Sequence, residues 1–326
     1  MNIAFFSTQP YDQQSFEQQE NKHTIKFLQA SLNEQTVNLA KDCQAVCVFV
    51  NDQLNEAVLK ALVELGVKVI ALRCAGFNNV DVKVAHEQNL KLVRVPAYSP
   101  HAVAEHALAL IMTLNRKTHK AYNRVREGNF SLDRLTGFDL FGKTVGVIGT
   151  GKIGACFAKI MLGMGCHLLA HDIFEDKTLV DAGVQYVSIS ELLKQSDIVS
   201  LHCPLTAETT HLINKESLPT MKRGAMLINT SRGALVNTKD VIHSLKSGQL
   251  GYVGIDVYEQ EAQLFFHDLS ENVIQDDVIL RLLSFPNVLI TSHQAFLTDE
   301  ALMQIARVTL QNISDFEQGR VLENEV

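Results

Sequence analysis

The amino-acid sequence predicts an α/β protein with two doubly wound, parallel-sheet domains, and three observations lead to this fold class. The chain has 326 residues, more than one ordinary hydrophobic core accommodates. Short apolar runs alternate with helical segments in both halves, which is typical of parallel sheets covered by helices. An apolar run at 145–148 breaks directly into a G-x-G-x-x-G pattern. We therefore expect a Rossmann domain and a flavodoxin-like domain, with a cleft between them.

The first alternation of strands and helices ends before Pro96. Strands are expected at 2–7, 23–28, 45–50, 67–72 and 90–95, and helices at 33–41, at 55–65 and in a segment ending near Gln88. A polar, Gln-rich stretch separates the first two strands, and it is assigned no helix. Since no glycine pattern follows the first strand, this domain should lack a dinucleotide site of its own.

The segment 101–116 contains no glycine or proline and predicts one long apolar helix, entered at Pro100, that crosses into the second domain. A polar stretch follows, and a second alternation begins at Lys143. Its strands are expected at 145–148, 167–171, 197–202, 225–229, 252–256 and 288–291, which matches a Rossmann sheet. The connection 257–285 is too long for a plain link between strands, so we expect it to serve a function.

The last segment, 298–319, has the spacing of an amphipathic helix and should return to the first domain. We therefore expect a discontinuous first domain of residues 1–100 and 296–326. The second domain should span residues 101–295.

Composition argues against several classes of partner. The formal net charge of −7 gives no general attraction to nucleic acid or to an anionic membrane. The 6 cysteines are scattered without a C-x-x-C pair, so no metal site and no disulfide framework is expected. No signal segment or long apolar run occurs, which predicts a cytoplasmic protein.

The three glycines Gly149, Gly151 and Gly154 predict a dinucleotide site. The first allows a tight turn, the second lets the backbone approach a pyrophosphate, and the third lets helix and strand pack closely. The phosphates would lie on the N-terminus of a helix that begins near Lys152. The next strand ends in Asp172, near the spacing of about 20 residues at which an acid binds the ribose hydroxyls.

Polar side chains that follow the other strands are candidates for the chemistry. Arg232 follows the strand 225–229, and a guanidinium can bind the carboxylate of a small organic acid with two parallel hydrogen bonds. His293 follows the strand 288–291 and is a candidate acid–base group. His202, at the end of its own strand, competes for that role.

A catalytic imidazole needs a partner on its second nitrogen, and three carboxylates are available for it. Asp256, Glu259 and Glu261 all lie at or just past the strand 252–256, and the residues alone do not decide among them. In the first domain, the turn 74–77 offers backbone N–H groups, and Tyr98 is a further candidate for the cleft. An ordinary turn and a packing aromatic remain equally open for these two.

Five segments together resemble the D-2-hydroxyacid dehydrogenase family. They are GTGKIG (149–154), LHCPL (201–205), INTSRGALV (228–236), GIDVYEQE (254–261) and TSHQAF (291–296). They lie in the family's order across the chain. The segments LRCAGFNNVD and VPAYSPHAVAEHA are most similar to the fermentative D-lactate dehydrogenases.

The resemblance implies roles for individual residues. Arg232 would bind the substrate carboxylate, His293 would be the acid–base group and Glu261 would orient it. The implied cofactor contacts are Gly149, Thr150, Gly151, Lys152, Ile153, Gly154, Asp172, His202, Cys203, Pro204, Thr230 and Asp256. The implied substrate contacts, besides Arg232 and His293, are Ala75, Gly76, Tyr98 and Phe296. The first domain would then be the substrate (catalytic) domain and the second the NAD-binding domain.

The activity implied is NAD-dependent, reversible reduction of pyruvate to D-lactate in a homo-oligomer built on the helix after Pro100. The D stereochemistry comes from the resemblance alone. Two alternatives remain at this point. One is a dehydrogenase for another 2-keto acid, either bulkier or of the glyoxylate and hydroxypyruvate kind. The other is a non-catalytic module that senses NAD, because a fold does not fix a function.

Overall fold

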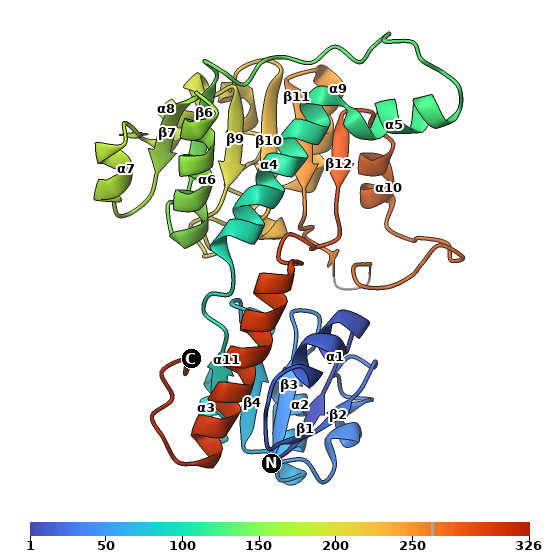
Figure 1. The fold of residues 1–326 in the computed structure, drawn as a ribbon, viewed down its shortest axis with the longest axis vertical. Helices are drawn as coiled ribbons and strands as arrows, with labels where there is room; N and C mark the ends of the chain where they lie inside the picture. Colours follow the sequence, from blue (N-terminus) through green and yellow to red (C-terminus); the bar gives the residue numbers. More distant parts are fainter. Residues whose placement is uncertain (262–263) are drawn as a thin grey trace. The chain divides into compact units, whose positions relative to one another are not determined.

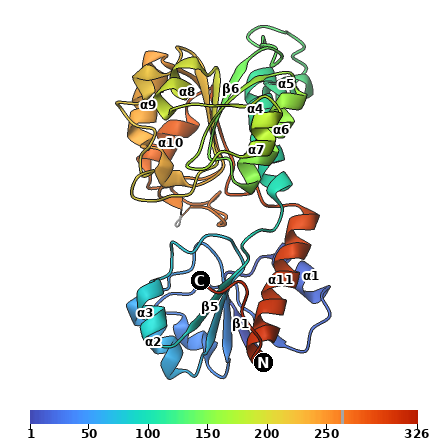
Figure 2. The ribbon, with the colours of Figure 1, turned by 90° about the vertical axis from the view of Figure 1, so that its left-hand side faces the viewer.

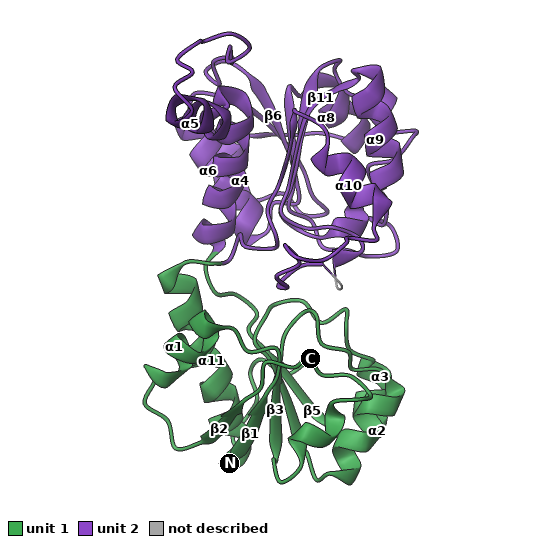
Figure 3. Cartoon of the chain, turned by 90° about the vertical axis from the view of Figure 1, so that its right-hand side faces the viewer, with its two compact units in different colours: residues 1–99, 297–326 green, residues 100–296 purple. Residues whose placement is uncertain are grey.

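The computed structural model describes residues 1–261 and 264–326 and divides into two compact units (Figure 3). One unit contains residues 1–99 and 297–326, and the other contains residues 100–296. Each unit has its own parallel sheet with helices on both faces, which confirms the predicted fold class of two parallel-sheet α/β domains. Within the described residues, no helix combines the length and apolarity needed to cross a membrane.

The first unit has a 5-stranded sheet in the order β2-β1-β3-β4-β5, the flavodoxin-like order. Its strands are β1 (Asn2–Phe5), β2 (Thr24–Phe27), β3 (Ala45–Val48), β4 (Val69–Leu72) and β5 (Lys91–Arg94). Every residue of β3 and β4 is buried, as expected for central strands covered on both faces. The strand order reverses between β1 and β3.

Helices cover both faces of this sheet (Figure 2). They are α1 (Pro10–Glu17), α2 (Glu56–Glu64), α3 (Val82–Glu87) and α11 (Asp299–Glu317), with a 3₁₀ turn η1 (Val37–Ala40). The first and last helices lie on one face, and the other two lie on the opposite face. α11 matches the amphipathic helix expected at 298–319, and it packs beside β4 and β5.

Two segments of the first unit differ from the sequence expectation. The helix expected at 33–41 is only the 3₁₀ turn η1, because the Asn33 side chain accepts the backbone N–H groups of Gln35 and Thr36 and closes a turn. The Gln-rich stretch contains α1, which begins at Pro10 with a capping box. This helix was missed because its only large buried apolar side chain is Phe16.

The second unit has a 7-stranded parallel sheet in the order β12-β11-β10-β9-β6-β7-β8. Its strands are β6 (Thr144–Ile148), β7 (His167–His171), β8 (Gln185–Tyr186), β9 (Ile198–Leu201), β10 (Ala225–Asn229), β11 (Leu250–Ile255) and β12 (Val288–Ile290). This is the Rossmann order, extended by β12, and the order reverses between β6 and β9. β8 was not expected, since a two-residue edge strand leaves no readable pattern.

Helices again cover both faces of the second sheet (Figure 1). They are α4 (Pro100–Arg116), α5 (Thr118–Arg126), α6 (Lys152–Gly163), α7 (Lys177–Asp181), α8 (Ile189–Gln195), α9 (Thr238–Ser247) and α10 (Asp277–Leu283), with 3₁₀ turns η2 (Leu218–Thr220) and η3 (Gly233–Leu235). α4 is the long helix expected after Pro100, whereas α5 lies in the polar stretch and buries no residue. α10 lies in the long connection 257–285, within which residues 262–263 are outside the described residues.

A buried arginine joins the strand ends of the first unit. Arg73, directly after β4, is 1% exposed, and its Nε and Nη2 donate to the Asp12 carboxylate at 3.3 Å. Its Nη1 and Nη2 donate to the backbone carbonyls of Phe6 and Ser7 at 3.1 and 2.8 Å. One side chain therefore ties the carboxyl ends of β1 and β4 to helix α1.

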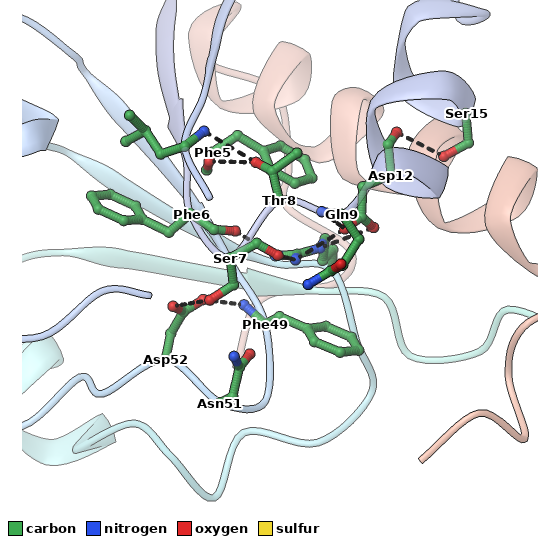
Figure 4. A network of polar contacts seen from close by, with 12 residues as sticks. Phe5, Phe6, Ser7, Thr8, Gln9, Asp12, Ser15, Phe49, Asn51 and Asp52 are labelled. Carbon is green, nitrogen blue, oxygen red and sulfur yellow. Dashed lines mark hydrogen bonds and ion pairs between the residues drawn. The ribbon is translucent and has the colours of Figure 1, made fainter. Parts of the chain in front are cut away.

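A buried carboxylate completes this network (Figure 4). Asp52 accepts from Ser7 Oγ at 2.8 Å, from Leu32 N at 2.7 Å and from Phe49 N at 2.6 Å. Burial raises the pKa of Asp52, and the Arg73 charge and these hydrogen bonds oppose that rise. The loops after β1 and β3 are thus fixed around three buried ionisable side chains, Arg73, Asp12 and Asp52.

Replacing Arg73 with methionine should strongly destabilise the first unit. The change leaves the Asp12 carboxylate buried without its cation, which costs about 3–5 kcal/mol. Urea unfolding followed by circular dichroism measures the loss. The exposed Lys60, which pairs with Glu56, supplies a matched control, and Lys60→Met should leave the midpoint unchanged. Equal midpoints for the two variants would contradict the importance of the buried network.

Candidate functional site

The glycine-rich loop after β6 has the shape of a phosphate cradle. Gly149 has φ +93°, and a Cβ there would clash with the Cys203 backbone, while a Cβ at Gly154 would clash with the Gly149 carbonyl. These two glycines therefore permit close packing at the strand-order reversal. A Cβ at Gly151 would meet nothing within 4 Å. The space beside Gly151 is open to a group that approaches the backbone, as a pyrophosphate does.

The helix that follows this loop begins without a side-chain cap. Gly151 is the N-cap of α6 and has no side chain to accept the N–H groups of the first turn. Those N–H groups and the positive end of the helix dipole suit an anion. The loop and the helix start are thus built for the same kind of ligand.

Asp172 lies at the end of β7, beside the glycine loop. Its Oδ2 accepts from Thr150 N at 2.5 Å and its Oδ1 accepts from Ile173 N at 2.7 Å. The Tyr186 hydroxyl donates to Thr150 Oγ1 at 2.9 Å, so β8 helps to fix the loop. The next two residues, Ile173 and Phe174, are 86% and 78% exposed and carry no cation. This is where an acid binds the ribose hydroxyls of a dinucleotide.

Buried polar atoms lie at the ends of β9 and β10. His202 hydrogen-bonds Ser200 Oγ through Nε2 at 2.8 Å, while its Nδ1 has no partner among the described residues. Thr230 Oγ1 is likewise buried without a partner there. A bound group or a water can pair buried polar atoms of this kind, and their place at two neighbouring strand ends fits the wall of a ligand site.

Burial also decides which histidine can exchange protons. It lowers the pKa of His202 to about 3, so this imidazole is neutral near pH 7 and is a poor proton donor. The neighbouring Cys203 is a buried thiol whose pKa burial raises to about 11, so it stays protonated. The next residue, Pro204, accepts the Thr209 hydroxyl on its carbonyl at 2.7 Å. This segment offers surface and hydrogen bonds rather than acid–base chemistry.

His293 is paired with a carboxylate. Its Nδ1 lies 2.8 Å from Glu261 Oε1, and Glu261 Oε2 accepts from Tyr258 N at 2.9 Å. The two side chains are 16% and 22% exposed, and no described residue accepts at His293 Nε2. The pair therefore presents Nε2 to a ligand while Glu261 fixes the ring.

The other two candidate carboxylates have different partners. Glu259 lies 2.8 Å from His211 Nε2 in a more exposed pair. Asp256 is fully buried and accepts the backbone N–H groups of Gln294 and Ala295 at 2.9 Å each. Among the three alternatives left open by the sequence, only Glu261 contacts the His293 imidazole.

Arg232 carries a charge that no described carboxylate neutralises. Its Nη1 donates to the Ser231 carbonyl at 2.7 Å, and its own carbonyl accepts from Asn229 Nδ2 at 2.8 Å. A Cβ on the next residue, Gly233, would clash with the backbone at Tyr258. This contact holds the Arg232 segment against the segment that leads to Glu261. The sequence analysis assigns no role to Gly233. The glycine directly after Arg232 is the feature of the sequence that could have indicated this close backbone contact.

Ala75, Gly76 and Tyr98 are the candidate substrate contacts that lie in the first unit. Ala75 and Gly76 follow Arg73 at the end of β4, and Arg94 Nη1 donates to the Ala75 carbonyl at 2.7 Å. Within residues 1–261 and 264–326, neither of their N–H groups has a hydrogen-bond acceptor. Tyr98 is half-buried, and Phe296, at the end of the second unit, is buried. The unpaired N–H groups are suited to an anionic ligand.

Comparison with known proteins identifies the family. Residues 108–295 match the model of the "D-isomer specific 2-hydroxyacid dehydrogenase, NAD binding domain". The chain is 54% identical over 331 residues to 2-hydroxyacid dehydrogenase A of Aspergillus oryzae, covering 100% of this chain and 95% of that protein. It is 51% identical over 328 residues to D-lactate dehydrogenase of Escherichia coli, covering 100% of both chains.

Solved structures agree with this comparison. The apo-structure of the Escherichia coli D-lactate dehydrogenase superposes with a TM-score of 0.92, at 48% identity in that alignment and with 100% of both chains covered. The Aquifex aeolicus D-lactate dehydrogenase complexed with NAD and lactic acid gives a TM-score of 0.88 at 34% identity, covering 100% of this chain and 99% of that one. The predicted family resemblance is therefore confirmed, and the chain belongs to the NAD-binding D-isomer specific 2-hydroxyacid dehydrogenase family.

Proposed function

We propose that this protein is a D-lactate dehydrogenase that reduces pyruvate reversibly to D-lactate with NADH. The observation that carries the proposal is that one unit holds the His293–Glu261 pair, an Arg232 that no described carboxylate neutralises, and the phosphate cradle. Identity of 51% over the full length of the Escherichia coli D-lactate dehydrogenase supports pyruvate as the substrate. When bound, NADH supplies the hydride for the keto carbon.

The second unit would hold the cofactor and corresponds to the NAD-binding domain expected at residues 101–295. The first unit, expected as residues 1–100 and 296–326, would be the substrate domain. The residues proposed to contact NAD are Gly149, Thr150, Gly151, Lys152, Ile153, Gly154, Asp172, His202, Cys203, Pro204, Thr230 and Asp256. The open position at Gly151 and the unpartnered atoms of His202 and Thr230 support this assignment.

Substrate recognition would rest on the carboxylate of the keto acid. Arg232 can bind that carboxylate with two parallel hydrogen bonds and draw electron density from the neighbouring carbonyl. The N–H groups of Ala75 and Gly76 would add neutral donors, and Tyr98 and Phe296 would limit the room for the substrate side chain. The Arg232 guanidinium by itself suits a small keto acid with one carboxylate.

His293 would donate and accept the proton that is exchanged with the substrate oxygen. During reduction, its Nε2–H would donate to the oxygen that becomes the hydroxyl of lactate, and during oxidation the neutral nitrogen would take that proton back. Glu261 would balance the positive charge of the protonated ring and keep Nε2 aimed at the substrate. The protein's contribution is thus orientation, charge balance and one proton at a defined atom.

We also propose a cytoplasmic homo-oligomer. The apolar residues of α4 are largely used inside its own unit, for example Ala104, Ala107 and Ile111, which are 0% exposed. Downstream of α4, large apolar side chains are exposed on α5 and the segment after it: Tyr122, Val125, Phe130 and Leu132. The contact between subunits would be built on α4, with this exposed apolar surface beside it.

A panel of 2-keto acids tests the proposed substrate. Initial rates with pyruvate, phenylpyruvate, 2-ketoisocaproate, glyoxylate and hydroxypyruvate should give the highest kcat/KM for pyruvate, with D-lactate as the product on a chiral column. NADPH should be at least about tenfold poorer than NADH, because the Asp172 carboxylate repels a 2′-phosphate. A higher kcat/KM for a bulkier acid, or L-lactate as the product, would contradict the assignment.

Arg232→Lys should be far from conservative. Lysine keeps the charge but loses the two parallel hydrogen bonds, so kcat/KM for pyruvate should fall by about a hundredfold. NADH affinity, measured by fluorescence titration, should change by less than about twofold. Arg223→Lys, at an exposed arginine that donates to Ser247, is the matched control and should behave as wild type. Weakened NADH binding with normal use of pyruvate would make Arg232 a cofactor residue instead.

Glu261→Gln should lower turnover while leaving NADH binding intact. The amide oxygen can still accept from Nδ1, but it carries no charge to balance the protonated ring, so kcat should fall by about tenfold or more. Glu259→Gln is the matched control, because Glu259 pairs with His211 and not with His293. A larger loss in the Glu259 variant would reverse the assignment of the orienting carboxylate.

A further inference from the structure

One buried carboxylate holds the turn that carries His293. Asp256 Oδ1 accepts from Thr291 Oγ1 at 2.6 Å and from Gln294 N at 2.9 Å, and Oδ2 accepts from Ala295 N at 2.9 Å. The backbone carbonyl of Asp256 accepts from His293 N at 2.7 Å. Together with Thr291 N, which donates to the Ile255 carbonyl at 3.0 Å, these bonds attach the turn 291–295 to the end of β11.

His293 needs this attachment because its backbone is strained. Its φ of +52° lies in the left-handed region, which is unfavourable for a residue with a Cβ. Such a conformation persists only where the surrounding contacts impose it. The direction of the imidazole therefore depends on the hydrogen bonds to Asp256, which hold the backbone, as well as on Glu261, which holds the ring.

His106, on α4, is hydrogen-bonded to the same group. Its Nε2 lies 3.0 Å from Thr291 Oγ1 and 3.4 Å from Asp256 Oδ1. The Thr291 hydroxyl has one hydrogen and donates it to Asp256, so its oxygen accepts from His106. Nε2 of His106 therefore carries a proton, which it directs at Thr291 and the carboxylate.

The charge on Asp256 depends on these donors. Burial opposes ionisation of Asp256, yet the hydrogen bonds from His106 and Thr291, with the electrostatic attraction of the His106 and His293 rings, outweigh it, and the pKa of Asp256 lies below its usual value. An ionised carboxylate accepts at both oxygens, as the two N–H groups of the turn require. His106 thereby helps to keep Asp256 in the form that binds the turn.

Helix packing brings His106 to this position. His106, Leu110 and Leu114 are spaced four residues apart and share one face of α4. A Cβ at Gly254 of β11 would lie 3.1 Å from Leu114 Cδ1 and 3.3 Å from Leu110 Cβ, so the helix packs directly on that strand. His106 is the polar member of this face and lies over the end of β11, where Asp256 follows.

We propose that His106 is a positioning residue for His293: its Nε2–H holds Thr291 and Asp256, and these hold the turn that aims the catalytic imidazole. The proposal deepens the proposed function, on which it rests for the role of His293. His106 itself would touch neither the substrate nor the reacting atoms.

Two substitutions distinguish the hydrogen bond of His106 Nε2 from the packing of its side chain. His106→Leu removes the donor and keeps an apolar body of similar size, whereas His106→Gln retains a side-chain N–H of comparable reach. His243→Leu, at an exposed histidine of α9, is the matched control. Each variant is measured by hydrogen exchange and mass spectrometry on the peptide 289–297 of the full chain, and by steady-state reduction of pyruvate.

In His106→Leu, the amides of residues 293–295 should exchange about tenfold faster or more, since their acceptor is less firmly held. The same variant should lose about tenfold to a hundredfold in kcat, as a misplaced catalytic group does, with KM for pyruvate and NADH affinity within about threefold of wild type. His106→Gln should restore most of both properties, and His243→Leu should match wild type.

Unchanged exchange of the turn in His106→Leu would overturn the proposal, as would a glutamine variant no better than the leucine variant. Hydrogen exchange needs neither substrate nor cofactor. If the wild-type protein reduced none of the 2-keto acids, the proposed function would fail, and exchange alone would decide whether His106 holds the turn.

Discussion

Parallel pairing places the carboxyl ends of all the strands on one edge of the second sheet, and the candidate site depends on this constraint. The residues that follow successive strands there are Gly149, Asp172, His202, Thr230, Asp256 and Thr291. They come from points spread over less than half of the chain but far apart in sequence, and the pairing brings them to a common edge. The reversal of strand order between β6 and β9 then separates the following helices and leaves room for a ligand.

This constraint explains which parts of the site could be predicted from sequence. Gly149, Gly151, Gly154 and Asp172 have a spacing that follows from one strand, one turn and one helix, so a linear pattern is sufficient to find them. The choice among Asp256, Glu259 and Glu261 depends on the path of the backbone after β11 and on the contact of Gly233 with Tyr258. The spacing of residues in the sequence does not determine that path. The burial of His202 also depends on tertiary packing, because neighbouring strands and helices cover the imidazole.

The fold shows the same division between local and tertiary information. Strands that are buried on both faces, such as β3, β4 and β9, are continuous apolar runs and were expected close to their observed positions. α1 is stabilised by its capping box and by the buried Asp12, and η1 is set by the side chain of Asn33. Polar contacts of this kind leave no periodic pattern of apolar residues in the sequence. The pattern therefore predicts no helix at α1 and a helix longer than the observed η1.

The position of α11 in the chain has a consequence for biosynthesis. This helix lies on β4 and β5, although nearly two hundred residues of the second unit are synthesised between them. During translation, all strands and helices of the second unit are synthesised before α11. Until α11 is synthesised, one apolar face of the first unit's sheet stays incompletely covered. The first unit therefore completes its core only after α11 has been synthesised, and until then its uncovered apolar face favours aggregation or binding by chaperones.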